Sequence, residues 1–141
     1  MSDPFGLYRF VEAQASCLDA VERELRAGRK TSHWMWFVFP QLRGLGKSAM
    51  AERYGLASVA EASAYAQHPV LGPRLREHTR LVTGHDRSVA EIFGSPDDLK
   101  FHSCITLFAH TPEPDVFRAA LAKHFGGVED ARTLELLAHP H

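Results

Sequence analysis

The sequence lacks any run of about 18 apolar residues, the length that a helix needs to span a bilayer. It has only two cysteines, Cys17 and Cys104, too few for a disulfide framework, and we expect both as reduced thiols. Neither sign of charge dominates, because 16 Lys and Arg stand against 17 Asp and Glu. That balance argues against nucleic-acid binding through bulk charge. We expect neither a membrane nor a nucleic-acid partner, and a cytoplasmic location because no apolar signal segment opens the chain.

Several common metal-binding and catalytic sequence motifs are also missing. The nine histidines form no HExxH pair, and the cysteines form no CxxC pair. There is no Gly-x-Ser-x-Gly elbow and no catalytic Cys–His signature. We therefore expect no dedicated metal site and no cofactor.

What is present is an ordinary globular composition, with 45% hydrophobic and 23% charged residues in 141 positions. This predicts one compact domain over residues 1–141. Apolar residues step by three and four between Leu7 and Leu25, which predicts a helix that starts at Asp3-Pro4 and ends near Gly28. Capping residues and glycines predict further helices over 48–54, 58–67, 71–82, 95–109, 115–125 and 131–138, and one more that begins at Ser88. The expected fold is all-α, with seven or eight short helices and little or no regular sheet.

The most unusual segment is Trp34–Phe39, which is apolar throughout and stops at Pro40. It is short for a helix and fits a buried extended segment, in which Trp34 and Trp36 would share a face. The two indoles either stack on a base or sugar or belong to the core. His33, directly before them, is a candidate acid or base near neutral pH.

The segment Gly44-Leu45-Gly46-Lys47-Ser48 resembles the end of a phosphate-binding P-loop. It lacks the first glycine of that motif, because Gln41 stands at the corresponding position. Two interpretations remain. Gly44 and Gly46 let the backbone approach an anion, with Lys47 adding charge and Ser48 opening a helix. Alternatively, the segment is a plain turn before a capped helix. Gln41 is included among the candidate ligand-binding residues.

Two polar side chains of the first helix are further candidates. Gln14 sits inside the apolar stripe, as either a ligand-contacting amide or a structural one. Glu12 faces the other side, as a solvated or a catalytic carboxylate. On the helix that follows Asp97, Lys100 and Ser103 are spaced to contact one anion together. The core stripe of that helix is predicted to be Phe101, Cys104, Ile105 and Phe108.

Taken together, these segments resemble the bacterial domain-of-unknown-function family eighteen-ten. The similarity is carried by Arg9–Gln14, His33–Leu42 with Gly44-Leu45-Gly46, His68–Leu75 and Ile92–Lys100. The resemblance implies one all-helical cytoplasmic domain. Members are often labelled calpastatin, but inhibitors of that name are long and repetitive, whereas this chain has no repeats.

A shorter match, over Val11–Gln14 and Lys100-Phe101, is similar to the YbiA-like superfamily, which is helical and linked to N-glycosidic cleavage of ribosylated or ADP-ribosylated substrates. The resemblance suggests an enzyme that binds or hydrolyses a nucleotide-like compound. In that hypothesis Trp34 or Trp36 stacks a ring, Lys47 and Lys100 hold phosphates, Gln14 or Ser103 contacts ribose, and Glu12 or His33 supplies acid or base. The alternative is a non-catalytic domain that senses a small anion or binds a protein.

Overall fold

The computed structural model describes residues 3–139, which form ten α-helices and one isolated parallel bridge between Leu42 and Leu56. The all-α prediction is confirmed, and no regular sheet occurs in this range. The predicted domain, 1–141, extends two residues beyond the described range at each end. The helices are α1 (Tyr8–Ala15), α2 (Leu18–Ala27), α3 (Met35–Val38), α4 (Ala49–Tyr54), α5 (Val59–Gln67), α6 (Leu71–Thr83), α7 (Val89–Phe93), α8 (Asp97–Phe108), α9 (Asp115–Phe125) and α10 (Ala131–Ala138).

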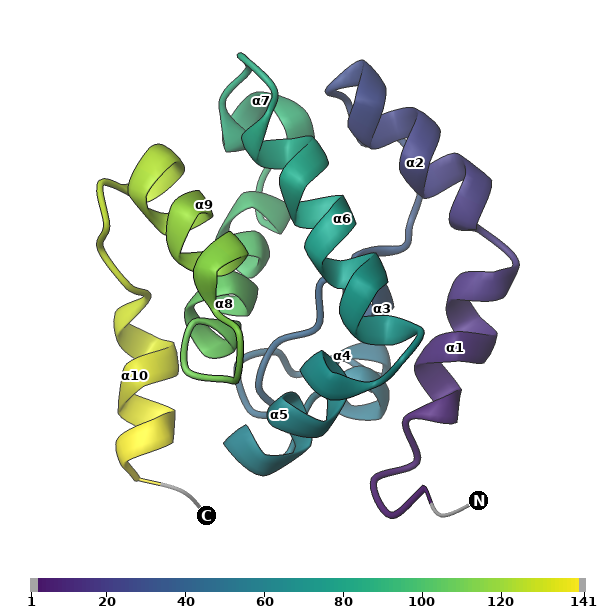
Figure 1. Cartoon of the computed structure of the whole chain (residues 1–141), viewed down its shortest axis with the longest axis vertical. Coiled ribbons are helices and arrows are strands. Elements are labelled where there is room, and N and C mark those ends of the chain that lie inside the picture. Colours follow the sequence, from purple (N-terminus) through teal and green to yellow (C-terminus); the bar gives the residue numbers. More distant parts are fainter. Residues whose placement is uncertain (1–2, 140–141) are drawn as a thin grey trace.

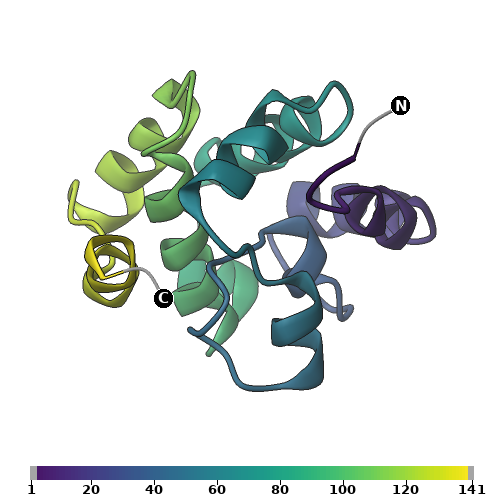
Figure 2. The same ribbon diagram turned by 90° about the horizontal axis from the view of Figure 1, so that it is seen from below.

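Helix α8 is the most enclosed element, because it packs against α5, α7, α9 and α10. Its predicted core stripe is confirmed, since all four of those side chains are fully buried. Burial raises the pKa of the Cys104 thiol well above its ordinary value, as expected for an inert core cysteine. Helices α1 and α2 lie along one side of the molecule and α10 along the opposite side (Figure 1), and Figure 2 shows the same separation from below. None of the helices in residues 3–139 has the length and apolar character needed to cross a membrane.

The prediction of one helix from Asp3 to Gly28 is wrong, because the chain breaks at Ser16-Cys17 into α1 and α2. The Asp3 carboxylate accepts hydrogen bonds from the backbone N–H groups of Leu7 and Tyr8, so it caps a helix that begins only at Tyr8. Apolar residues face the core on both sides of the break. Periodicity alone therefore could not reveal it.

The Trp34–Phe39 segment is not extended, because residues Met35–Val38 form the short helix α3. This helix and the break in the first one explain why ten helices are found where seven or eight were predicted. The predicted caps are mostly confirmed: Ser48, Ser58 and Ser88 each accept a hydrogen bond from the third residue of their helix. Glu91 completes the box at α7, whereas the Glu61 carboxylate binds Ala57 N–H instead of Ser58.

The loop that leads into α3 is held by one buried carboxylate, that of Glu24 on α2. Its oxygens accept hydrogen bonds from the N–H groups of Thr31 and Ser32, the Ser32 hydroxyl and the Trp34 indole, at 2.7–3.0 Å. Burial by itself raises the pKa of this carboxyl, but the four hydrogen bonds outweigh burial and lower the pKa from 4.5 to about 2. The ionised form of Glu24 therefore stabilises the fold at neutral pH.

We expect Glu24→Gln to lower the free energy of unfolding at pH 7 by about 3 kcal/mol, the linkage value of that lowered pKa. The carboxylate contributes fully above its unfolded pKa near 4.5, and the contribution is lost as the pH falls toward 2. Urea unfolding followed by circular dichroism between about pH 2 and pH 7 measures this difference. Glu12→Gln, at an exposed glutamate of α1, is the control. Equal stability of the two variants at pH 7 would contradict the role of Glu24.

Candidate functional site

The two tryptophans have different environments, because residues two positions apart in a helical turn lie about 200° apart around its axis. Trp34, directly before α3, is only 1% exposed, and its indole donates to Glu24. Trp36 is partly exposed and lines a recess. The expectation that the two rings share one face is therefore wrong. Trp34 belongs to the core, and Trp36 is the indole that a ligand can reach.

The recess around Trp36 is formed by three parts of the chain. The lining residues are Met35, Trp36 and Phe39 from the α3 region, Gln41, then Ala51, Tyr54 and Gly55 at α4, and Lys100 from α8. Its volume is about 10 Å³, which is room for about one water. The predicted ligand residues Trp36, Gln41 and Lys100 thus meet at one place. A nucleotide-sized molecule, however, would contact only its mouth.

Two lysines and one carboxylate connect the tryptophans. The Lys100 ammonium lies 5.1 Å from the centroid of the Trp36 ring, and the Lys30 ammonium lies 5.1 Å from that of Trp34. Asp97 contacts both lysines, at 2.8 Å for Lys30 and 3.6 Å for Lys100. The Lys100 side chain is 26% exposed and that of Lys30 only 8%, so Lys100 is the cation that a ligand can reach.

Lys30 and Asp97 are not among the site residues predicted from the sequence. One signal was available for Asp97, because it precedes Lys100 by three residues, a spacing at which side chains of a helix interact. No comparable signal marks Lys30, which comes next to Asp97 only through the packing of the α2–α3 loop on the start of α8.

The glycine-containing loop lies beside the recess. Ser48 caps α4 by accepting from the Ala51 N–H at 3.1 Å, as in the plain-turn interpretation. Gly46 packs so closely on α4 that a Cβ there would lie 2.7 Å from the Ala51 Cβ, and 3.5 Å from the Gln41 amide nitrogen. Lys47 is exposed. Anion binding by this loop stays a prediction.

Gly44 lines a different feature, an open groove of about 470 Å³ between the 42–59 region and α10. Arg43, Glu52 and Ser58 contribute its polar atoms. The remaining walls are apolar and come from Leu42, Ala57, Val59, Leu136 and Leu137. The residues predicted to act together are therefore separated: Gln41 lines the recess and Gly44 this groove, whereas Gly46, Lys47 and Ser48 line neither.

Two other predicted ligand residues have partners within the protein. The Gln14 amide donates to the Phe37 carbonyl oxygen at 2.6 Å and to the Tyr65 hydroxyl at 3.1 Å, and its oxygen accepts from Arg74. Ser103 donates to the Leu99 carbonyl oxygen and to Asp130. Both side chains hold helices together in this structure. A role in ligand contact stays a prediction for each.

The predicted acid–base residues lie apart from the recess lining. Glu12 is exposed on α1 and His33 is exposed before Trp34. Among the described residues, no hydrogen bond or ion pair connects either side chain to a residue that lines the recess. Within the same range, no three His, Cys, Asp or Glu side chains gather as a metal site.

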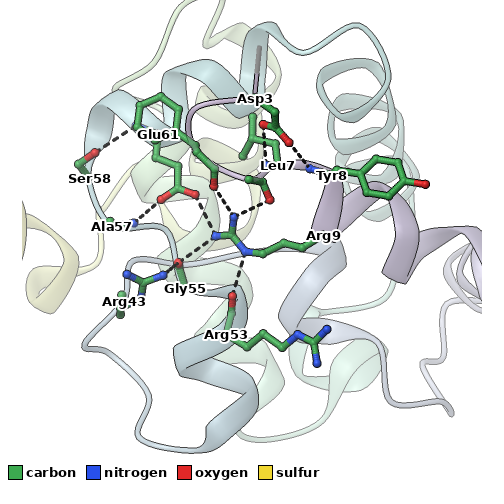
Figure 3. Close-up of polar contacts among 12 residues, drawn as sticks. Asp3, Leu7, Tyr8, Arg9, Arg43, Arg53, Gly55, Ala57, Ser58 and Glu61 are labelled. Atoms are coloured by element: carbon green, nitrogen blue, oxygen red, sulfur yellow. Dashed lines mark hydrogen bonds and ion pairs between the residues drawn. The ribbon is translucent and has the colours of Figure 1, made fainter. Parts of the chain in front are cut away.

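The α4 wall of the recess is positioned by Arg9 (Figure 3). The Arg9 guanidinium donates to the carbonyl oxygens of Phe5, Gly6, Arg53 and Gly55 and to the Glu61 carboxylate. Glu61 is 3% exposed and also accepts from the Ala57 N–H at 2.8 Å. Arg9 therefore ties α1 to the end of α4 and the start of α5, next to Tyr54 and Gly55 of the recess.

Comparison with known proteins places the chain in a family. A family model described as protein of unknown function, DUF1810, matches residues 4–137. The chain belongs to this family. The DUF1810 chain is also similar to the crystal structure of the conserved hypothetical protein Rv1873 from Mycobacterium tuberculosis, with a TM-score of 0.94 and 61% identity over 96% of this chain and 99% of that one. No curated protein matches it.

In this DUF1810 protein we expect Arg9→Lys to lower the free energy of unfolding by about 2 kcal/mol, because an ammonium cannot reproduce the planar set of five donors. Urea unfolding measures the loss, and amide exchange at Ala57 is expected to accelerate as Glu61 loses its partner. Arg23→Lys, at an exposed position of α2, is the control and should change stability by less than about 0.5 kcal/mol. Matching effects in both variants would refute the role of Arg9.

Proposed function

We propose that this DUF1810 protein binds a small anionic, nucleotide-like ligand at the mouth of the recess. The observation that carries the proposal is the reachable Lys100 ammonium over the partly exposed Trp36 ring. Lysine binds a phosphate as a point charge, and an indole offers a flat surface to a base or sugar. Gln41 lines the same recess and adds an amide that can both donate and accept.

The small volume of the recess determines how such a ligand would bind. Because the interior has room for only about one water, the planar group of the ligand lies across the mouth, against Trp36. Lys100 covers that ring and must turn toward the anionic group when the ligand arrives. Its long, partly exposed side chain allows this movement without a change of the backbone.

Cleavage of an N-glycosidic bond is a further prediction and is separate from binding. It passes through an oxocarbenium-like state, which needs a carboxylate close to the sugar. Asp97, whose carboxylate lies 3.6 Å from the Lys100 ammonium, is a candidate for this role beside Glu12. A turnover assay with ADP-ribosylated substrates tests Glu12→Gln and Asp97→Asn for the catalytic carboxylate and His33→Ala for the acid or base. The non-catalytic alternative, sensing of a small anion, uses the same two binding residues without turnover.

The binding proposal is tested by titration calorimetry with ADP-ribose, AMP and NAD. We expect Lys100→Met to weaken binding by roughly 10-fold or more, the value of a lost hydrogen bond to a charged group. Trp36→Leu is expected to weaken it by at least about fivefold, because the stacking surface is removed.

Two controls separate the recess from other basic positions. Arg23→Met removes an exposed charge from the middle of α2, at a residue that does not line the recess, and should leave affinity unchanged. Lys47→Met asks whether the glycine-containing loop also holds the anion. Binding that is absent in the wild-type protein for all three ligands, or that persists unchanged in Lys100→Met and Trp36→Leu, would show the proposal to be wrong.

A further inference from the structure

Asp97 holds two lysines unequally. Its contact with Lys30 is 2.8 Å, a normal charge-assisted hydrogen-bond length, whereas its contact with Lys100 is 3.6 Å, longer than a hydrogen bond. Lys30 is nearly enclosed, with its ammonium over the buried Trp34 ring. The Lys30–Asp97 pair is therefore the tight half of the arrangement, and Lys100 is held loosely.

The charges of Lys30, Asp97 and Lys100, here called the trio, do not cancel. Two ammonium groups face one carboxylate, which leaves one positive charge in surplus. Because Asp97 is bound closely by Lys30, that surplus resides at Lys100, on the more exposed side of the trio. A doubly charged phosphate group attracts an ammonium more strongly than a singly charged carboxylate at the same distance, since the Coulomb energy scales with charge.

We propose that the Asp97 carboxylate competes with the ligand for Lys100, and that a phosphate or pyrophosphate group of the ligand replaces Asp97 at Lys100 on binding. Lys30 is the positioning residue that holds Asp97 back from Lys100. The inference rests on the proposed binding at Lys100 and specifies the anion that is bound there. Lys30 itself does not touch the ligand. Its effect on affinity passes entirely through Asp97.

This arrangement gives a definite order of affinities. Asp97→Asn removes the competitor and is expected to tighten binding by roughly twofold to fivefold, the range for a partly exposed ion pair. Lys30→Met preserves the apolar contact with Trp34 but lets Asp97 turn to Lys100, which weakens binding by a similar factor. In the double variant the competitor is gone, so its affinity should equal that of Asp97→Asn.

The experiment uses pyrophosphate as the probe, with the indole N–H signal of Trp36 as the readout in NMR titrations of the full chain. Pyrophosphate has no ring, so it reports on Lys100 rather than on stacking. Asp98→Asn is the matched control, because it removes an acidic residue from the same first turn of α8 without touching a lysine of the trio. Thermal unfolding of each variant checks that all of them are folded.

The outcomes separate this inference from the proposed function. The inference is overturned if Asp97→Asn binds pyrophosphate no more tightly than Asp98→Asn, or if Asp97→Asn binds no pyrophosphate. It is also overturned if Lys30→Met weakens pyrophosphate binding as much in the Asp97→Asn background as it does in the wild-type protein. If ADP-ribose binds through Trp36 while any of these occurs, only the inference is wrong. If the pyrophosphate order holds but none of the nucleotides binds, the nucleotide part of the proposed function is wrong and the exchange at Lys100 stands.

Discussion

The hydrogen bonds to the buried Glu24 carboxylate are the interaction on which the site depends most. They fix the loop at Thr31 and Ser32, and they keep the Trp34 indole in the core. With Trp34 held inside, the helical turn that follows directs Trp36 toward the recess. A buried charge is tolerated only when its hydrogen-bonding capacity is met, and here that requirement also determines which tryptophan a ligand can reach.

Three of the polar side chains predicted as ligand contacts are used by the fold. Gln14 joins α1 to the α3 and α5 regions, Ser103 joins α8 to the start of α10, and Ser48 caps α4. Lys100 differs from them, because its carboxylate contact is long and its side chain is partly exposed. The proposed function therefore relies on the side chain whose contact with the protein is long and partly exposed, since exchanging that contact costs least.

Local rules predicted much of this structure and failed at two places. Capping serines, glycines and apolar spacing gave the bounds of α4, α9 and α10 correctly, because these signals act within a few residues. They failed at Ser16-Cys17, where the apolar stripe continues through a break, and at Trp34–Phe39, where a run of apolar residues is compatible with strand or helix. In both cases tertiary packing decided between conformations that the local sequence permits.

The sequence by itself determined the helical class, most helix ends and membership in the DUF1810 family, because those depend on short-range spacing and on motifs that can be compared directly. Only the tertiary structure decided that Trp34 is buried and Trp36 reachable, and that Lys30 and Lys100 share Asp97. The physical reason is distance along the chain. Lys30 and Asp97 belong to segments that meet only when α2, its following loop and α8 pack together, and no local periodicity records that contact.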